Sequence, residues 1–301
     1  MVGRICFFLL FALVSQAVFA QDSASTNADV SGRILERIQK AQIGFSGKVW
    51  IYAKNLDTGA EFGLRQDERV RTASTIKLPI MAETFRQVSE GKLRWDQKIT
   101  LTKDKKVGGS GILHEFSDDT VIDLRTAVHL MIVVSDNTAT NLVLDLVGSD
   151  NVNANAKRLG LDQTLSLRKV FGGGDSSALK ADETLKMFGL GVSSPRDMAR
   201  LLEMIENGKV VSKEASAEMI GILKRQQFKD GIGRNLPDTI ESASKSGALD
   251  RLRSDVGILY TRKGRLVIAI TVDDMSEVTY TADNPGLHMI WKISQILQDE
   301  M

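Results

Sequence analysis

The chain has 301 residues, of which 43% are hydrophobic and 26% are charged. This composition fits one or two globular domains and excludes a disordered or fibrous chain. Its 39 Lys and Arg residues almost balance its 38 Asp and Glu residues, so a formal charge of +1 gives no reason to expect nucleic acid or an anionic membrane as a partner.

The first twenty residues differ from the rest of the chain. Arg4 is followed by an apolar run from Ile5 to Val18, and Ala20 supplies the small residue typical of a signal-peptide cleavage site. The run is short for a membrane span, and an uncleaved anchor is the alternative. We expect cleavage near Ala20, a periplasmic or secreted protein, and no stable membrane span. Cys6 is the only cysteine, so the mature chain would contain no thiol.

The two ends of the remaining chain mix helices and strands. After a polar lead-in over residues 21–30, the hydrophobic spacing predicts a helix over Arg33 to Ile43. Strands are predicted over Lys48–Ala53 and Glu61–Leu64, with a turn at residues 55–59. Near the C-terminus, the predicted elements are strands over Ile240–Ser246, Val256–Arg262 and Leu266–Val272, a hairpin turn at Lys263-Gly264, and a helix over Leu287–Leu297.

The middle of the chain is predicted to be helical, with strand signals nearly absent. Thr120 and Asp123 resemble a capping box at the start of one helix. The predicted helices are Ser74–Val88, Thr120–Val133, Asn137–Val147, Ser194–Ile205 and Ala215–Lys224. This order predicts an α/β fold, in which an antiparallel sheet of five strands is flanked by N- and C-terminal helices and carries an inserted all-helical domain. We expect the sandwich over residues 30–71 and 226–301, and the insertion over residues 72–225.

A serine and a lysine three residues apart on a helix lie on one face, where the amine can accept the hydroxyl proton if its pKa is lowered. The spacing occurs five times, at Ser74/Lys77, Ser89/Lys92, Ser166/Lys169, Ser177/Lys180 and Ser242/Lys245. The context favours Ser74, because strand-like sequence leads directly into it and places it at a helix N-terminus, where free N–H groups stabilise negative charge. Pro79 fits this helix imperfectly, since it removes one backbone hydrogen bond.

Two further motifs follow at suggestive distances. Ser135-Asp136-Asn137 lies between two predicted helices, and Lys245-Ser246-Gly247 lies on a predicted strand that continues to Ala248. A strand with a cation, a small residue and glycine allows a substrate backbone to approach closely. In this order and spacing, Ser74-Thr-Ile-Lys77 and the two later motifs resemble the signature elements of class A β-lactamases and penicillin-binding proteins over about residues 30–300.

The resemblance implies a role for each motif residue. Ser74 would be the acylated nucleophile, Lys77 would act in its proton network, and Ser135 would pass a proton to the leaving nitrogen. The backbone N–H groups of Ser74 and Ala248 would form the oxyanion hole. The substrate would be held by Asn137, Lys245, Ser246 and Gly247. Arg253 would add attraction for a carboxylate, although its register is one residue off the family position and a solvated surface charge is the alternative. Asp136 is expected to be structural.

The chain departs from the family pattern in the loop after the second motif. Class A β-lactamases carry a glutamate there that activates the deacylating water, within a Glu-x-x-Leu-Asn pattern that is absent from this sequence. If Arg168 matches the arginine that opens the family loop, the place of the glutamate falls at Val170. Asp175, Asp182 or Glu183 could replace it, although each is also what a solvated loop would carry. Lys77 or Ser135 could serve instead, or deacylation could lack a base.

The resemblance therefore implies a class A-like serine β-lactamase. The alternative is a penicillin-binding D-alanyl-D-alanine peptidase or esterase with slow β-lactam turnover, and a third hypothesis is a non-catalytic β-lactam sensor. We expect a monomer that binds a small molecule, either a β-lactam or a cell-wall peptide. No cofactor or metal is expected, because His114, His129 and His288 are isolated in the sequence and no His-Glu-x-x-His pattern occurs.

Overall fold

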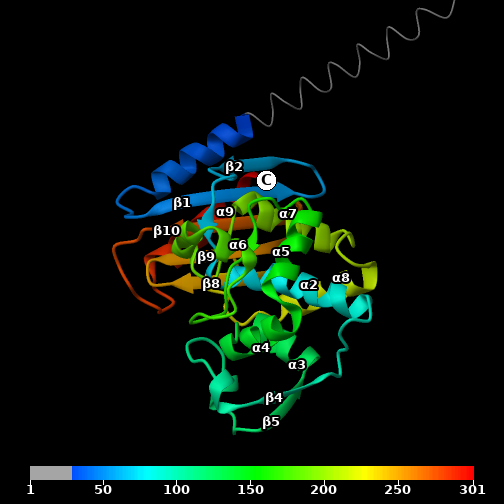
Figure 1. The fold of residues 1–301 in the computed structure, drawn as a ribbon. Helices are drawn as coiled ribbons and strands as arrows, with labels where there is room; N and C mark the ends of the chain where they lie inside the picture. Colours follow the sequence, from blue (N-terminus) through cyan, green and yellow to red (C-terminus); the bar gives the residue numbers. More distant parts are fainter. Residues whose placement is uncertain (1–28) are drawn as a thin grey trace, which may run out of the picture.

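The computed structural model describes residues 29–301, and its centre is a five-stranded antiparallel sheet with the order β2-β1-β10-β9-β8 (Figure 1). The strands are β1 (Lys48–Asn55), β2 (Glu61–Leu64), β8 (Glu241–Leu249), β9 (Leu252–Thr261) and β10 (Gly264–Asp273). The beginning and the end of the chain thus complete one sheet, as predicted. The turn between β9 and β10 lies at residues 262–263, one residue earlier than expected.

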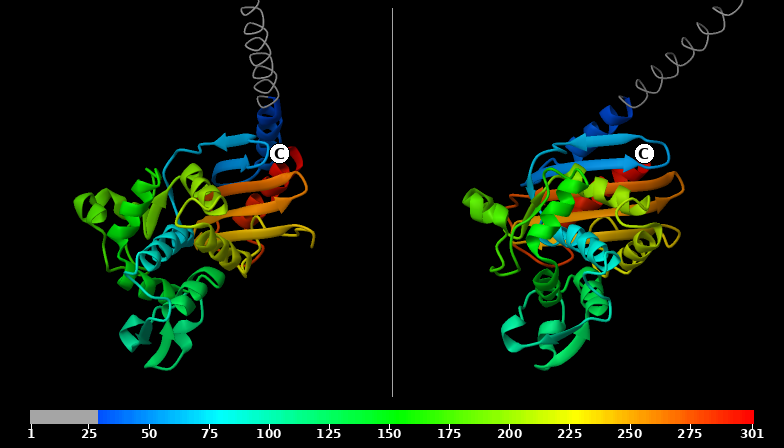
Figure 2. Two further views of the ribbon diagram at one scale, coloured as in Figure 1. Left: turned by 90° about the vertical axis from the view of Figure 1, so that its right-hand side faces the viewer. Right: turned by 45° about the vertical axis from the view of Figure 1, so that its right-hand side comes forward.

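Two terminal helices cover the outer face of the sheet (Figure 2). The first spans residues 29–41, and the last is α9 (Pro285–Glu300). They pack on strand residues of one parity in a single apolar cluster that includes Ile38, Ile293 and Ile270. Both predicted terminal helices are confirmed, although the first ends two residues before Ile43. The predicted signal peptide, Cys6 and most of the polar lead-in lie outside the described residues.

The helices from the middle of the chain lie on the inner side of the sheet, and only some of them pack on it directly. These are α2 (Lys77–Ser89), α3 (Leu124–Val133), α4 (Asn137–Val147), α5 (Ser149–Arg158), α7 (Pro195–Glu206) and α8 (Lys213–Lys224). Helix α7 packs on β1 and β10, and α8 packs on β8. A second apolar cluster runs without interruption from Met81 and Leu202 to Val256 and Ile258 on the sheet. The helical layer and the inner sheet face therefore share one core.

The middle of the chain also contains short strands, so the inserted region is not all-helical as predicted. Strands of two to four residues are too short to show an alternating pattern in the sequence. They form one sheet of β3 (Val70–Arg71), β7 (Gly191–Ser193) and β6 (Leu165–Ser166), and a hairpin of β4 (Lys98–Leu101) and β5 (Thr120–Asp123). The remaining elements are α6 (Ser177–Ala181) and the 3₁₀ turns η1 (Ala73–Ile76), η2 (Lys103–Lys105), η3 (Leu113–Glu115) and η4 (Glu183–Phe188).

The predicted helix over Thr120–Val133 is wrong at its start. Residues 120–123 pair with β4 as a strand, and Asp123 is the N-cap of α3, where its carboxylate accepts a hydrogen bond of 2.9 Å from the Thr126 N–H. Asp123 therefore caps the helix by itself, and Thr120 has no part in a capping box. Helix α5 was missed because most of its residues are polar and only Val152 and Ala156 give it a buried apolar side.

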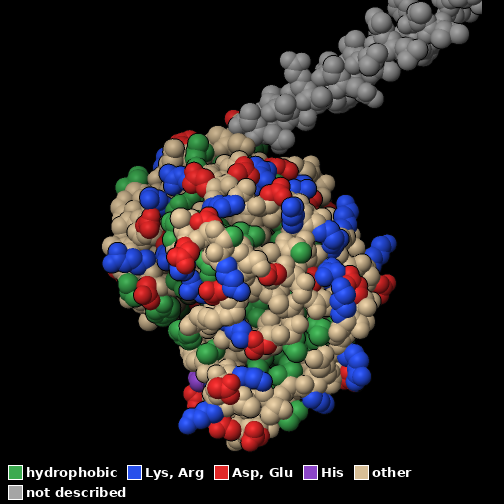
Figure 3. Space-filling model, viewed as in Figure 1, with side chains coloured by type: hydrophobic (Ala, Val, Ile, Leu, Met, Phe, Trp, Pro, Cys, Tyr) green, Lys and Arg blue, Asp and Glu red, His purple; other side chains and the backbone are tan. Residues whose placement is uncertain are grey.

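The charged residues of the surface are mixed in sign. On the face drawn in Figure 3, Lys and Arg side chains alternate with Asp and Glu side chains, in keeping with the nearly balanced composition. Within residues 29–301, no helix is both long and apolar enough to cross a bilayer.

Candidate active site

Ser74 lies in a tight turn where the chain passes from β3 into α2. Its neighbours Ala73, Thr75 and Ile76 are buried, whereas Ser74 is partly exposed. The turn is stabilised by the Thr72 carbonyl, which accepts hydrogen bonds from the Thr75 N–H (3.1 Å) and hydroxyl (2.8 Å). Ala73 has a φ of +47°, a conformation that costs energy for a residue with a Cβ and that is typical of functional sites.

Lys77, the first residue of α2, has a fully buried side chain. Its amine donates hydrogen bonds to the Ser135 carbonyl (2.7 Å), the Ser135 hydroxyl (3.1 Å) and the Asn137 side-chain oxygen (3.1 Å). Among residues 29–301, no hydrogen bond joins this amine to the Ser74 hydroxyl. The first two sequence motifs are therefore joined by the contact between the Lys77 amine and Ser135.

The Ser135-Asp136-Asn137 motif occupies the turn between α3 and α4. Ser135 has a φ of +53°, so a second strained residue lies at the site. Asp136 is the N-cap of α4 and accepts a hydrogen bond of 2.8 Å from the Ala139 N–H. It also accepts hydrogen bonds from the Ile112 and Leu113 N–H groups at 2.7 and 2.8 Å. This buried carboxylate fixes the turn and the loop beside it.

The third motif lies on β8, the edge strand of the sheet, and approaches Ser74 directly. A Cβ on Gly247 would lie 2.9 Å from the Thr72 carbonyl oxygen and 3.0 Å from the Ser74 backbone nitrogen. Only glycine permits this approach without movement of the backbone. Lys245 is fully buried, Ser246 is partly buried, and Ala248 is exposed beyond the glycine. All three motifs thus converge around the N-terminal end of α2.

The electrostatics of the site are dominated by two buried amines. Burial lowers the pKa of Lys77 well below its usual range, and the charge of Lys245 lowers it further, while Asp136 opposes the shift. Burial lowers the pKa of Lys245 to about 7, against a smaller opposing effect of Asp255. Within the described residues, neither amine forms an ion pair with a carboxylate. A neutral amine at Lys77 can accept a proton at neutral pH, which the chemistry of a serine nucleophile needs.

The structure buries Arg253 among backbone carbonyls, and its predicted attraction for a substrate carboxylate stays a prediction. Its guanidinium donates to the carbonyls of Leu249 and Leu252, both at 2.6 Å, and to that of Thr279, and it lies 4.7 Å from the ring centroid of Tyr280. Arg253 pairs in register with Val272, which belongs to the outer apolar cluster. Arg253 also pairs in register with Ala248, so it shares its face of the sheet with Ser246 and Ala248, and its hydrogen bond to Thr279 holds the loop before α9.

The loop after the second motif is attached to the site by an asparagine that the sequence analysis gave no role. The side chain of Asn141 accepts from the Val170 N–H at 2.9 Å and donates to the Val170 carbonyl at 3.2 Å. Asn141 lies one helical turn after Asn137, which is the signal that could have identified it. Val170, at the predicted place of the family glutamate, is therefore fixed beside the site with a buried apolar side chain.

Two of the three loop carboxylates considered as replacements are exposed and engaged with local partners. Asp182 is exposed and caps η4 through the Thr184 N–H at 3.0 Å, and Glu183 is exposed and pairs with Lys186 at 2.9 Å. Asp175 is half-buried within the glycine-rich part of the loop. The described residues contain no cluster of three or more His, Cys, Asp or Glu side chains that could hold a metal ion.

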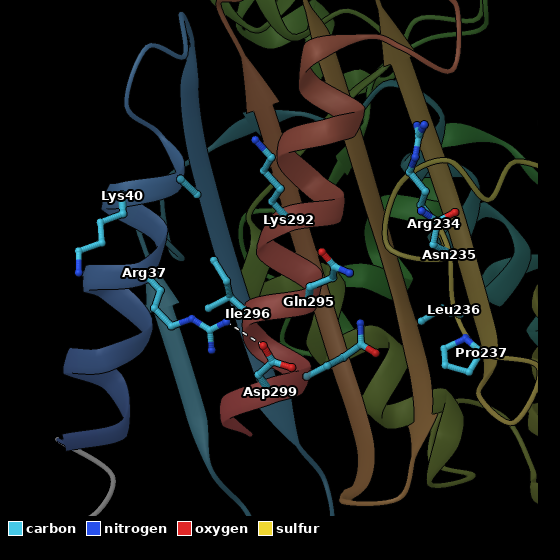
Figure 4. A pocket seen from close by; sticks show the side chains of 12 residues that line it. Arg37, Lys40, Arg234, Asn235, Leu236, Pro237, Lys292, Gln295, Ile296 and Asp299 are labelled. Carbon is cyan, nitrogen blue, oxygen red and sulfur yellow. Dashed lines mark hydrogen bonds and ion pairs between the residues drawn. The ribbon is translucent and has the colours of Figure 1, made fainter.

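A large surface cavity lies away from the three motifs. It has a volume of about 640 Å³ and is lined by the first helix, α9 and residues 234–237, on the outer side of the sheet (Figure 4). Arg37 points across it and pairs with Asp299. None of the predicted site residues lines this cavity, so its size alone does not identify the active site.

Comparisons with known proteins agree with this geometry. The model of the beta-lactamase enzyme family matches residues 33–301. The "Beta-lactamase" of Bacillus licheniformis is 29% identical over 276 residues, which cover 86% of this chain and 83% of that protein. The crystal structure of a beta-lactamase from Sphaerobacter thermophilus superposes with a TM-score of 0.77 at 30% identity, covering 89% of this chain and 96% of the other. A mutant of PBP-A, solved as an acyl-enzyme complex with penicillin G, gives 0.76 at 25% identity, covering 90% and 96%.

Proposed function

This chain belongs to the beta-lactamase enzyme family, and from that premise we propose that it is a serine hydrolase that opens β-lactam rings through an acyl-enzyme on Ser74. The observation that carries the proposal is the buried amine of Lys77, which contacts the Ser135 hydroxyl at 3.1 Å. Lys77 follows the partly exposed Ser74 by three residues. The names of the relatives favour a β-lactamase over the D-alanyl-D-alanine peptidase or esterase that the sequence left open.

In the acylation step, the Ser74 hydroxyl attacks the carbonyl carbon of the lactam, and its proton moves to the neutral Lys77 amine. As the C–N bond breaks, Ser135 donates its proton to the ring nitrogen and recovers one from Lys77. The contact between Lys77 and Ser135 supports this relay. The N–H groups of Ser74 and Ala248 would stabilise the oxyanion, each by about 3 kcal/mol.

Substrate binding would use the remaining motif residues. Lys245 and Ser246 would hold the substrate carboxylate, while Gly247 allows the substrate to lie along the edge strand β8. Asn137 would hold the amide of the acyl side chain. The arrangement supports this division of roles, because Lys245 and Asn137 come from two different elements, β8 and α4, that both lie near the Lys77 amine.

Deacylation requires a base for the attacking water. We assign this role to Lys77, because its amine is buried at the site whereas Asp182 and Glu183 are exposed and held by local partners. Water would attack the ester carbonyl, Lys77 would accept the water proton, and Ser74 would leave with a proton returned by the same amine. One amine would then serve both half-reactions.

The experiment that tests this function is intact-mass spectrometry of the protein mixed with a penicillin. The wild type should gain the mass of one penicillin, and Ser74→Ala should gain none. Ser89→Ala is the matched control, because Ser89 belongs to another Ser-x-x-Lys pair at the exposed end of the same helix. Absence of an adduct on the wild type, or an equal adduct on Ser74→Ala, would contradict the proposal. Turnover of nitrocefin, compared with that of D-alanyl peptides and esters, separates a lactamase from a peptidase.

The location of the protein is also a proposal. The sequence of residues 1–20 supports export through a secretory signal peptide and action outside the cytoplasm, where a β-lactamase protects the cell wall against antibiotics. We propose a monomer in that compartment. Fractionation of cells, combined with N-terminal sequencing for a start at Gln21, tests the export, and a protein retained in the cytoplasm with its full N-terminus would contradict it.

A further inference from the structure

Phe171 is an aromatic residue in an unfavourable setting directly after Val170. Its side chain is 77% exposed and its φ is +61°. The left-handed region is strained for a residue with a bulky side chain, whereas glycine adopts it freely. The next three residues, Gly172 to Gly174, are glycines with φ of 100°, 81° and 61°, so a glycine would suit position 171 equally well. Phe171 therefore stabilises the fold neither through its backbone nor through burial.

The ring of Phe171 lies beside the substrate-binding amide of the site. A Cβ built on Gly109 would lie 3.8 Å from the Phe171 Cζ atom and 2.9 Å from the Asn137 Nδ2 atom. The ring edge and the amide therefore border the same space, which the missing side chain of Gly109 leaves open. Asn137 is in turn the residue whose side-chain oxygen contacts the Lys77 amine at 3.1 Å.

The backbone around Phe171 is held by hydrogen bonds on both sides. Before it, the Val170 backbone is held by both hydrogen bonds of Asn141, which lies on the same helix as Asn137. After it, the chain turns back through hydrogen bonds between Lys169 and the glycines, from Gly172 N–H to the Lys169 carbonyl and from Lys169 N–H to the Gly173 carbonyl, both of 3.0 Å. The ring is therefore anchored at the rim of the site on a segment whose glycines permit adjustment.

We propose that Phe171 is a specificity-determining residue whose ring packs against an aromatic or flat apolar group on the acyl side chain of the substrate, on the side held by Asn137. This inference rests on the acyl-enzyme function proposed above. It identifies the preferred substrates as β-lactams with an aromatic acyl side chain, because two rings gain from stacking or edge contact beyond the area that they bury. The strain and exposure of Phe171 are then compensated only in the complex with substrate.

The test compares acylation of Ser74 by benzylpenicillin, which carries a phenylacetyl side chain, and by 6-aminopenicillanic acid, which has no acyl side chain. Phe171→Gly should lower the second-order acylation rate constant about fivefold for benzylpenicillin and less than twofold for 6-aminopenicillanic acid. The melting temperature should not fall, because glycine relieves the strain. Phe171→Asn, which also tolerates a positive φ, provides a second variant if the glycine variant folds poorly.

Val121→Ala is the matched control. Val121 is also an exposed apolar residue (54%), but it lies on β5 and is separated from Ser135 by the whole length of α3. This variant should change neither rate constant. One contrary outcome is that the Phe171 variants keep the wild-type ratio of the two acylation rate constants, either unchanged or after an equal loss in both. That result overturns the proposed role of Phe171 and leaves the acyl-enzyme function standing. If neither compound acylates the wild type, the function itself fails and this inference fails with it.

Discussion

Helix α2 contains two fully buried ionisable residues, Glu83 and Lys77, and they differ in their hydrogen-bond partners. Glu83, in the middle of the helix, is 0% exposed and accepts hydrogen bonds from the Arg86 guanidinium at 2.6 and 2.7 Å and from the Gln87 amide at 2.8 Å. Lys77, at the start of the helix, is also 0% exposed, but its amine contacts only uncharged oxygens, and a second buried amine at Lys245 lies close enough to lower its pKa.

The difference distinguishes a structural charge from a chemical one. A buried charge is tolerated when a partner of opposite sign and enough hydrogen bonds replace the lost water, as at Glu83. Where only hydrogen bonds are present, the group gives up its charge and its pKa shifts, as at Lys77. An active proton acceptor is therefore expected at the N-terminal end of α2, at Lys77. Glu83, six residues further along the same helix, contributes only to stability.

The largest effect should follow removal of the unpaired amine. Lys77→Met keeps much of the volume and should lower the acylation rate by penicillin about a thousandfold, because the general base is lost. In the wild type, the acylation rate should fall as the pH drops through the lowered pKa of Lys77, since only the neutral amine accepts a proton. Stopped-flow acylation kinetics between pH 5 and 9 measure both effects.

The control for this variant is its stability. Because Lys77 has no ion-pair partner among the described residues, Lys77→Met should unfold at the same or a higher denaturant concentration than the wild type. A variant that acylates at the wild-type rate, or one that retains the wild-type pH dependence, would show that Lys77 is not the base.

Removal of the paired charge should have the opposite profile. Glu83→Ala leaves Arg86 and Gln87 without their acceptor in a buried place and should lower the free energy of unfolding by about 3 kcal/mol. The acylation rate per folded molecule should stay within a factor of about two, because Glu83 does not contact the motif residues. Urea unfolding and active-site titration measure the two quantities. A large loss of acylation without loss of stability would remove the contrast between the two ends of α2.

The sequence predicted the α/β fold with its five-stranded sheet, and it also singled out the motifs that lie around Ser74. Ser74, Lys77, Ser135, Asn137 and Lys245 could be placed together because each motif sets its residues by short-range geometry within one turn or strand. The buried state of both lysines could not be predicted, because it depends on the packing of α2, α4 and β8 against one another. The carbonyl partners of Arg253 could not be predicted either, because one of them, Thr279, lies 26 residues further along the chain.

The short elements of the middle region show the same limit. The strands of residues 120–123 and 191–193 were missed because their pairing partners, β4, β3 and β6, are distant in sequence or only two to four residues long. The role of Asn141 could not be inferred from its neighbours alone, because its partner Val170 lies 29 residues away. Local patterns therefore located the reacting groups, and long-range packing decided which of them were buried, paired or facing the site.

Adding a carboxylate beside Lys77 and Lys245 would give these amines a partner of opposite charge, as Glu83 has in Arg86. Val170 is buried and its backbone is fixed by Asn141, so Val170→Glu would place an acid at the rim of the site. Its carboxylate should activate the deacylating water and shorten the lifetime of the acyl-enzyme about a hundredfold. Time-resolved intact-mass spectrometry measures this lifetime, and Val170→Gln, which has the same shape without the charge, is the control. Equal lifetimes in the two variants would exclude this position as a site for a base.

The smallest effect is the pH dependence of stability that Lys245 contributes, and the pKa of this amine gives its sign. Burial lowers the pKa of Lys245 to about 7 in the folded protein, against about 10.4 in an unfolded chain. Between these values the unfolded state binds one more proton, so the stability of the wild type relative to Lys245→Met should rise by about 1.4 kcal/mol per pH unit from pH 7 to pH 9. Below pH 7 this difference in the free energy of unfolding should become constant, because Lys245 is then protonated in both the folded and the unfolded state. Asp255, whose own pKa burial raises to about 7, destabilises the fold as the pH rises in a lower window, between about 4 and 7, and is present in both proteins. Because the charge of Lys245 also lowers the pKa of Asp255, the two proteins are compared in an Asp255→Asn background, where urea unfolding at pH 7, 8 and 9 isolates Lys245. A flat or falling difference would mean that this lysine keeps its charge in the folded state.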